Sequence, residues 1–270
     1  MSGGFSSDWL ALREPYDRRA RNQAVLDAVA TALRPRSPVR VVDLACGTGS
    51  TLRALSPHLP ARQSWQLVDH DPGLLAHALA TPLAMEVSVA AMPLDLNRDL
   101  ETALDGTIDL VATSALLDLV SAPWLERLAA AVAARAIPLY AALSYDGRAG
   151  FTPQDPYDAA ITTAVNAHQR TDKGFGPALG PAASAFAIAR FEALGYAVAQ
   201  GRSDWTMGAD DRDMQNEILA GWASAARDMN TLPHDDITAW LARRRDAVAG
   251  GRSSLYVGHV DFLAMPSATR

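Results

Sequence analysis

The chain has 270 residues, of which 49% are hydrophobic, so it has enough apolar material for a large folded core. Its formal net charge of −6 gives no overall attraction to nucleic-acid phosphates or anionic lipids, and we expect neither as a partner. The single cysteine, Cys46, excludes an internal disulfide and fits a reducing cytoplasm. Because no signal-like or membrane-spanning apolar run appears either, the sequence predicts a cytoplasmic protein.

The first half of the chain alternates between helical and strand-like patterns. A helical pattern runs from about Arg18 to Leu33, and residues 1–36 are predicted to form an N-terminal helical cap. Near-continuous aliphatic runs that alternate with helices are typical of a parallel sheet covered on both faces. The predicted strands are 39–45, 65–69, 87–94, 108–113 and 137–143, and the helices between them include 50–58, 72–80 and 122–136.

After Tyr145 this alternation stops. Residues 147–181 are rich in Gly and Pro at both ends and helix-like from about 156 to 170, which predicts an insertion over the edge of the sheet. No repeat or linker divides the chain, so we predict one domain spanning 1–270, with the two halves of its sheet in 37–146 and 182–270. The predicted elements of the second half are a helix at 182–194, a strand at 195–205, helices at 211–228 and 233–249, and a last strand at 253–265.

The turn after the first strand, in the stretch VVDLACGTGS, is the most informative local feature. Gly47 and Gly49 let the backbone approach a ligand closely, and the helix that begins near Ser50 directs free N–H groups toward it. A dinucleotide site needs a third glycine where this chain has Leu52. Asp43 would repel a pyrophosphate but suits a ligand that carries an ammonium group.

This stretch resembles motif I of the class I S-adenosylmethionine-dependent methyltransferases. Three further segments resemble later motifs of the family in the expected order: LVDHDPGLL, PLDL and IDLVATSALLDLV. The intervals from Asp43 to Asp69 and from Asp69 to Asp95 are each about 26 residues, which is about one βα unit. The resemblance implies a Rossmann-like, doubly wound α/β sheet of seven strands with an antiparallel last strand, plus the N-terminal helical segment and the helical insertion.

The resemblance also implies a cofactor, S-adenosyl-L-methionine, and its product, S-adenosyl-L-homocysteine, held by the half 37–146. In it, Asp69 accepts hydrogen bonds from the ribose hydroxyls, His70 packs near the adenine, and Asp95 and the backbone of Leu96 read the adenine edge. Ser114 lies where the fourth motif opens toward the transferred methyl group. The motif I residues Asp43, Ala45, Gly47, Thr48 and Gly49 would lie against the methionine part, and Tyr16 or Arg21 of the N-terminal segment would touch the cofactor. No metal is expected.

Methyl transfer mainly requires alignment of donor and acceptor, and a base helps when the acceptor is a hydroxyl or a protonated nitrogen. His168 and Asp172 are four residues apart, so on a helix they would share a face, and we predict them as the catalytic pair. The alternative is a solvated helix face that ends in a glycine cap. The residues predicted to contact the substrate are Asp118, Asn166, Gln169 and Lys173, and Asp118 serves equally well as a helix-start residue.

The sequence therefore predicts a methyltransferase that acts on an oxygen or nitrogen atom of a small molecule. Two alternatives stay open: methylation of a protein side chain, and a non-catalytic cofactor-binding subunit of another methyltransferase. We expect structural roles for Cys46, His259 and Asp261, and burial for Trp205. The oligomeric state is not predicted.

Overall fold

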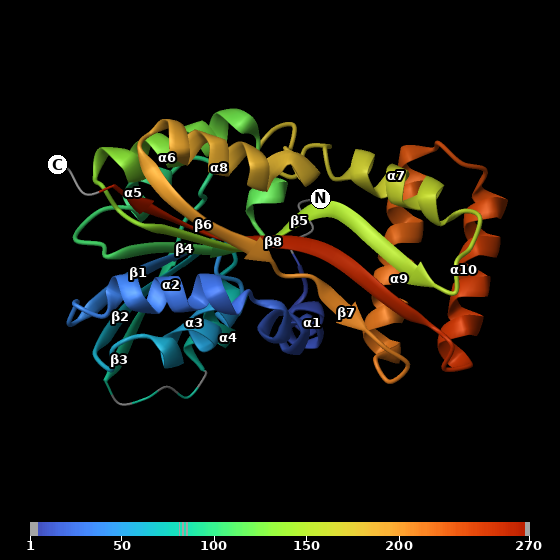
Figure 1. The fold of residues 1–270 in the computed structure, drawn as a ribbon, viewed down its shortest axis with the longest axis horizontal. Coiled ribbons are helices and arrows are strands. Elements are labelled where there is room, and N and C mark those ends of the chain that lie inside the picture. Colours follow the sequence, from blue (N-terminus) through green and yellow to red (C-terminus); the bar gives the residue numbers. More distant parts are fainter. Residues whose placement is uncertain (1–4, 81, 83, 85, 268–270) are drawn as a thin grey trace.

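The computed structural model describes residues 5–80, 82, 84 and 86–267. They form an eight-stranded sheet in the order β3-β2-β1-β4-β5-β8-β6, with β7 paired to β8 outside this order (Figure 1). The pairs from β3 through to β5 are parallel, whereas β8 is antiparallel to its neighbours. The strands are β1 (Val39–Leu44), β2 (Gln63–Asp69), β3 (Val87–Pro93), β4 (Leu110–Ser114), β5 (Leu139–Thr152), β6 (Tyr196–Arg202), β7 (Trp205–Met207) and β8 (Ser254–Pro266).

The predicted doubly wound sheet with an antiparallel last strand is confirmed, but the predicted count of seven strands is one too few. The expected strand 195–205 is broken at residues 203–204, where the chain leaves β6 and begins the short β7. Both segments pair with β8, at different positions along it. The polar residues Arg202, Ser203 and Asp204 mark this break in the sequence.

Helices cover both faces of the sheet (Figure 1). One hydrophobic cluster includes Val42, Trp124 and Phe191, and the opposite cluster includes Val41 and Trp65. Neighbouring residues of β1 thus enter different clusters, as the two-residue period of a strand requires. The helices are α5 (Leu100–Ala103), α6 (Ala122–Ala134) and α8 (Ala183–Ala193) on the first face, and α2 (Gln23–Leu33), α3 (Ser50–Leu55) and α4 (Pro72–Leu79) on the second, with short 3-10 turns at Ser56–His58, Leu117–Leu119 and Gly180–Ala182.

The N-terminal segment contains two helices where the pattern predicted one. Helix α1 (Ser7–Ala20) ends before Arg21, whose backbone is extended, and α2 follows. Asn22 caps α2 by accepting a hydrogen bond from the backbone N–H of Val25 (3.1 Å). Its own N–H donates to the carboxylate of Asp261 (2.9 Å), a residue of β8. A contact 239 residues away in the chain therefore fixes this break, which the helical periodicity does not reveal.

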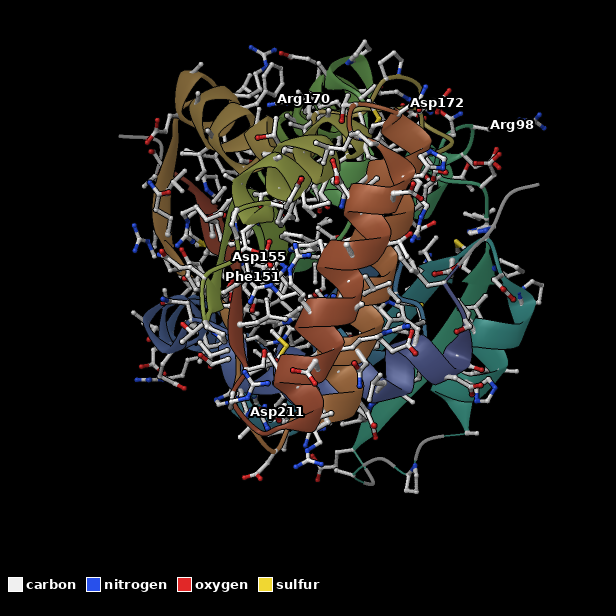
Figure 2. The ribbon with its side chains drawn as sticks, turned by 90° about the vertical axis from the view of Figure 1, so that its right-hand side faces the viewer. Arg98, Phe151, Asp155, Arg170, Asp172 and Asp211 are labelled. Atoms are coloured by element: carbon white, nitrogen blue, oxygen red, sulfur yellow. The ribbon has the colours of Figure 1, made fainter. Side chains whose placement is uncertain are left out.

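Strands β5 and β8 run beyond the rest of the sheet and carry a helical lobe (Figure 1). The lobe consists of α7 (Asp158–His168), α9 (Arg212–Met229) and α10 (His234–Ala249), with its own hydrophobic cluster around Trp240. Figure 2 views this side, with Phe151 and Asp155 beside α10 and Asp211 at the start of α9. The predicted insertion is thus placed differently from our expectation. Residues 147–152 belong to β5, and α7 packs on α9 and on β5.

The predicted division into one domain stays a prediction. Among the described residues, no helix combines the length and the apolar character needed to cross a membrane.

Candidate active site

The turn after β1 is built around a buried carboxylate. Asp43 has no exposed surface, and neither of its carboxylate oxygens has a hydrogen-bond partner. Burial raises the pKa of Asp43 to about 8, although the nearby Arg21 acts in the opposite direction. Gly47 and Gly49 both adopt left-handed backbone conformations, with φ of 54° and 83°. A Cβ atom on Gly47 would lie 3.2 Å from the side chain of Leu10, so α1 covers this turn closely.

Arg21 lies in the same buried region because the break between α1 and α2 turns it toward the sheet. Its guanidinium donates to the hydroxyl of Tyr140 (3.1 Å) and lies 3.5 Å from the hydroxyl of Ser114, while its Nε has no partner. A buried carboxylate and a buried guanidinium N–H are both left without partners, and an unpaired buried polar group is costly. These two groups fit the ammonium and the carboxylate of a free amino acid moiety.

Asp69 joins the end of β2 to the same turn. One carboxylate oxygen accepts the backbone N–H of Gly47 (2.9 Å), and the other accepts that of Asp71 (3.0 Å). His70 is exposed, and its Nδ1 lies 3.3 Å from the Asp69 carboxylate. The structure therefore brings Asp43, Asp69 and the glycine turn together, because β1 and β2 are parallel neighbours whose carboxyl ends meet.

The remaining motif residues surround this centre. The backbone carbonyl of Thr48 accepts a hydrogen bond from Arg53 (2.6 Å). Asp95 is exposed and accepts the backbone N–H of Asn97 (2.9 Å). Leu96 is buried, and its carbonyl accepts the indole N–H of Trp124 (2.8 Å). Each of these contacts orders a loop at the carboxyl end of a strand.

Cys46 is buried in the turn, and burial raises the pKa of its thiol. A thiol with a raised pKa is a poor nucleophile, which agrees with the expected structural role.

Tyr16 faces the lobe: its hydroxyl donates to Asp211 (2.8 Å) at the start of α9. Of the two N-terminal candidates, Arg21 lies next to Asp43 and Tyr16 is engaged by the lobe.

The predicted pairing of His168 with Asp172 is wrong. Helix α7 ends at His168, so the two side chains do not share a helix face. The Asp172 carboxylate instead accepts the backbone N–H groups of Gly174 (2.7 Å) and Gly176 (3.0 Å), which orders the following turn. In Figure 2, Asp172 lies on the same side of the molecule as Arg98.

His168 has other neighbours. Its Nδ1 lies 3.3 Å from the ammonium of Lys173, and its Nε2 lies 3.5 Å from the carboxylate of Asp228. Burial and the Lys173 charge lower the pKa of His168, against the opposing effect of Asp228. The side chain of Asn166 accepts the hydroxyl of Tyr145 (2.7 Å) and donates to a backbone carbonyl at Gly147 (3.1 Å).

A cavity of about 390 Å³ lies between the sheet and the lobe, bounded by α1, α7, α9 and residues of β5, β7 and β8. Two predicted substrate residues, Asp118 and Gln169, line it. No sequence motif points to the other lining residues, because they come from elements that are distant in the chain. The lining residues that the sequence analysis did not predict as substrate contacts include Trp9, Tyr145, Glu217, Trp222 and His259.

Three non-glycine residues with left-handed backbone mark the strand ends around this region. Ala45 follows β1 (φ 53°), Ala115 follows β4 (φ 51°), and Leu143 lies at an irregularity of β5 (φ 54°). Ala115 and Leu143 line the cavity. Such conformations are costly for residues with a side chain and cluster at functional sites. The cavity thus meets the sheet at the carboxyl ends of adjacent strands.

Trp205 is buried, as expected, and also forms part of the cavity wall. Its indole N–H donates to Asp17 (2.9 Å), which also binds Arg13 through two hydrogen bonds (3.0 and 3.2 Å).

In the part of the chain that the structure describes, no three His, Cys, Asp or Glu side chains are grouped so as to hold a metal ion.

Residues 41–137 match the family model described as a methyltransferase domain. Residues 41–137 therefore form a methyltransferase domain of the class I type that the sequence resembles. The matched segment runs from β1 to just before β5 and contains all four motifs. This confirms the resemblance to methyltransferases and the prediction of an enzyme.

Solved structures support the fold of this methyltransferase. A putative type II methyltransferase from Anaeromyxobacter dehalogenans is similar with a TM-score of 0.51 and 15% identity, over 90% of this chain and 95% of that one. A cyclopropane-fatty-acyl-phospholipid synthase-like protein from Lactobacillus casei has a TM-score of 0.50 and 15% identity, over 97% and 95% of the two chains. No curated protein matches the sequence.

Proposed function

We propose that this methyltransferase transfers a methyl group to an oxygen or nitrogen atom of a small molecule held in the cavity between the sheet and the lobe. The observation that carries the proposal is the position of Ala115. It follows β4 directly, in the segment that resembles the fourth family motif, and it lines the cavity. The acceptor would therefore meet the methyl group at the carboxyl end of β4.

The residues around the glycine turn fit the cofactor. Asp69 is proposed to accept hydrogen bonds from the ribose hydroxyls, and the unpaired groups of Asp43 and Arg21 suit the ammonium and carboxylate of its methionine part. When bound, the cofactor supplies an electrophilic methyl group on a sulfonium centre. Helix α1 lies over the turn through Leu10 and would exclude water from it.

The chain's contribution to the acceptor side is alignment. Asp118 and Gln169 are proposed to contact the acceptor, since both line the cavity. His168 and Lys173 form a polar pair near the end of α7. A role of His168 in proton transfer and a substrate contact of Lys173 stay predictions. The cavity is bounded by elements of both the sheet and the lobe, which favours a small molecule over a protein side chain.

Calorimetric titration with S-adenosylmethionine and S-adenosylhomocysteine tests the cofactor site. We expect micromolar binding to the unmodified protein and a loss of at least about 100-fold in Asp69→Ala, because two charge-assisted hydrogen bonds disappear. Asp109→Ala is the matched control, since Asp109 is also a buried carboxylate but precedes β4 at the opposite end of that strand. Absence of binding to either ligand would contradict the proposal.

A further inference from the structure

We propose that the methyl acceptor is a small organic amine, whose nitrogen lies beside the carboxylate of Asp118 among the aromatic side chains of the cavity. This inference rests on the proposed function and specifies its acceptor. It follows from three properties of the cavity: a carboxylate oxygen without a hydrogen-bond partner, aromatic walls, and an excess of negative charge among the other lining side chains.

The acidic group is Asp118, whose carboxylate accepts backbone hydrogen bonds at Asp118 and Tyr145 but keeps one oxygen without a partner. It lies in the 3-10 turn that follows β4, three residues after Ala115, and only 5% of its surface is exposed. Its Oδ1 has no hydrogen-bond partner, although the residue lines the cavity. A buried carboxylate oxygen without a partner is costly unless a ligand supplies one. A hydrogen-bond donor, and best a charged one, is therefore the chemical complement of this position.

The walls of the cavity are aromatic. Trp9 and Trp205 meet edge to face with ring centroids 6.3 Å apart, and His259 lies against Trp205 (4.7 Å). Tyr145 in turn lies 6.2 Å from His259, and Trp222 lines the cavity from α9. The faces of aromatic rings carry partial negative charge and attract organic cations. An ammonium group with an apolar body suits such a wall better than a carboxylate does.

The remaining charges around the cavity leave an excess of negative charge. Among the described lining residues, Arg13 is the basic one, and its guanidinium is engaged by Asp17 and stacked 4.9 Å from the Trp205 ring. Burial and the Arg13 charge lower the pKa of His259 to about 3, so its imidazole is neutral at physiological pH. Glu217, at the exposed side, adds a second acidic group. The balance favours a cationic ligand over an anionic one.

The reaction on an amine is balanced as follows. The bound ammonium first loses one proton to solvent, which frees the nitrogen lone pair. This pair forms a bond to the methyl carbon while the bond from that carbon to the sulfonium sulfur breaks, and its electrons stay on sulfur. Positive charge thereby moves from sulfur to nitrogen. The ionised Asp118 next to the nitrogen stabilises the charge that develops there.

Binding of three small benzene derivatives to the full chain tests this inference. Benzylamine is a cation at pH 7.5, benzyl alcohol is its neutral counterpart, and benzoate is an anion. Tryptophan fluorescence reports binding, because Trp9, Trp205 and Trp222 line the cavity, and calorimetry confirms it. We expect benzylamine to bind at least about tenfold more tightly than benzyl alcohol, and benzoate to bind most weakly.

Asp118→Asn removes the charge and keeps the shape, so it should abolish the preference for benzylamine without changing the affinity for S-adenosylhomocysteine. The control Asp109→Asn should keep the preference, since Asp109 lies at the other end of β4. A second measurement needs no variant. Burial raises the pKa of Asp118 to about 6, so the preference should shrink between pH 7.5 and pH 5 as the carboxyl group takes up a proton. Over this range His259 stays neutral, and Arg13, Asp17 and Glu217 also face this region.

Equal affinities for benzylamine and benzyl alcohol, or a preference that survives in Asp118→Asn, would overturn the inference. Each titration is made with and without S-adenosylhomocysteine. If S-adenosylhomocysteine binds but no preference for the amine appears, the inference fails and the proposed function stands. If S-adenosylhomocysteine does not bind, the proposed function fails, while the three probes alone still show whether the cavity selects a cation.

Discussion

At the scale of single residues, two of the buried carboxylates in the site have an incomplete set of hydrogen bonds, Asp43 below the glycine turn and Asp118 in the cavity. Both have oxygens without partners, and burial raises the pKa of both, to about 8 and about 6. Such groups reduce the stability of the ligand-free protein when they are charged. A positively charged ligand that binds next to these carboxylates would offset this cost.

Asp43→Asn should stabilise the ligand-free protein at pH 8, by on the order of 2 kcal/mol. The folded-state pKa lies above the unfolded value of 3.8, so the stability associated with the protonated group is present at low pH and is lost as the pH rises toward 8. The difference between variant and unmodified protein should therefore shrink toward pH 5. Urea unfolding at pH 5 and pH 8 measures it, and a variant less stable at pH 8 would contradict this account.

Arg21→Met should weaken binding of S-adenosylhomocysteine by about 10- to 100-fold, because a charge-assisted hydrogen bond to the amino acid carboxylate is lost. Titration calorimetry measures the affinity. Arg34→Met is the control, since Arg34 is exposed and caps the far end of α2. An unchanged affinity in Arg21→Met would remove Arg21 from the cofactor site.

At the scale of elements, helix α1 is held over the glycine turn by an ion pair. The guanidinium of Arg53, on α3, binds both carboxylate oxygens of Glu14 on α1 at 2.6 Å, and it also reaches the carbonyl of Thr48. Although burial opposes it, Arg53 holds the pKa of Glu14 below its usual value. The helix that covers the cofactor site is thus attached to the helix that begins at that site.

Glu14→Gln should increase the dissociation rate of S-adenosylhomocysteine by about 3- to 10-fold, since the loss of a bidentate, partly buried pair costs about 1 kcal/mol and loosens α1. Stopped-flow displacement measures this rate. The control is Glu101→Gln, which breaks a comparable pair with Arg127 on a face of the molecule remote from α1. Equal dissociation rates in both variants would show that α1 does not retain the cofactor.

At the scale of the whole molecule, the sheet carries the proposed cofactor site and the lobe closes the proposed acceptor cavity. The long pair β5 and β8 connects them, and the lobe has a separate hydrophobic cluster. The lobe is further anchored through Arg244, which is buried and binds Asp158 at the start of α7. Cofactor binding and acceptor binding should therefore respond differently to damage in the lobe.

Trp240→Ala removes a fully buried indole from the lobe cluster and should cost about 3 to 5 kcal/mol of local stability. Amide hydrogen exchange should increase in α7, α9 and α10 but not in β1 to β4, and S-adenosylhomocysteine should still bind. Trp65→Ala, in the cluster beside β1 and β2, should reduce cofactor binding as well. Uniformly faster exchange in Trp240→Ala would show that the lobe and the sheet unfold together.

Much of the cofactor half was predictable because its determinants are local. Asp43, Gly47 and Asp69 stand next to strand ends that the aliphatic runs identify, and parallel pairing brings those ends together. The acceptor side was not predictable in the same way. The expected pair of His168 and Asp172 required a helix that continues to Asp172, but α7 ends four residues earlier, at His168. The Asp172 carboxylate instead orders the glycine-containing turn after α7, in line with the alternative of a glycine-capped helix end.

By itself, the sequence determined the family, the parallel sheet and the position of the glycine turn, because strand patterns and turn residues act over short distances. Only the tertiary structure decided the cavity. Its walls join Trp9, Asp118, Trp205 and His259, which lie far apart in the chain and come together through the extension of β5 and β8. Long-range packing places these side chains, and such packing leaves no local pattern in the sequence.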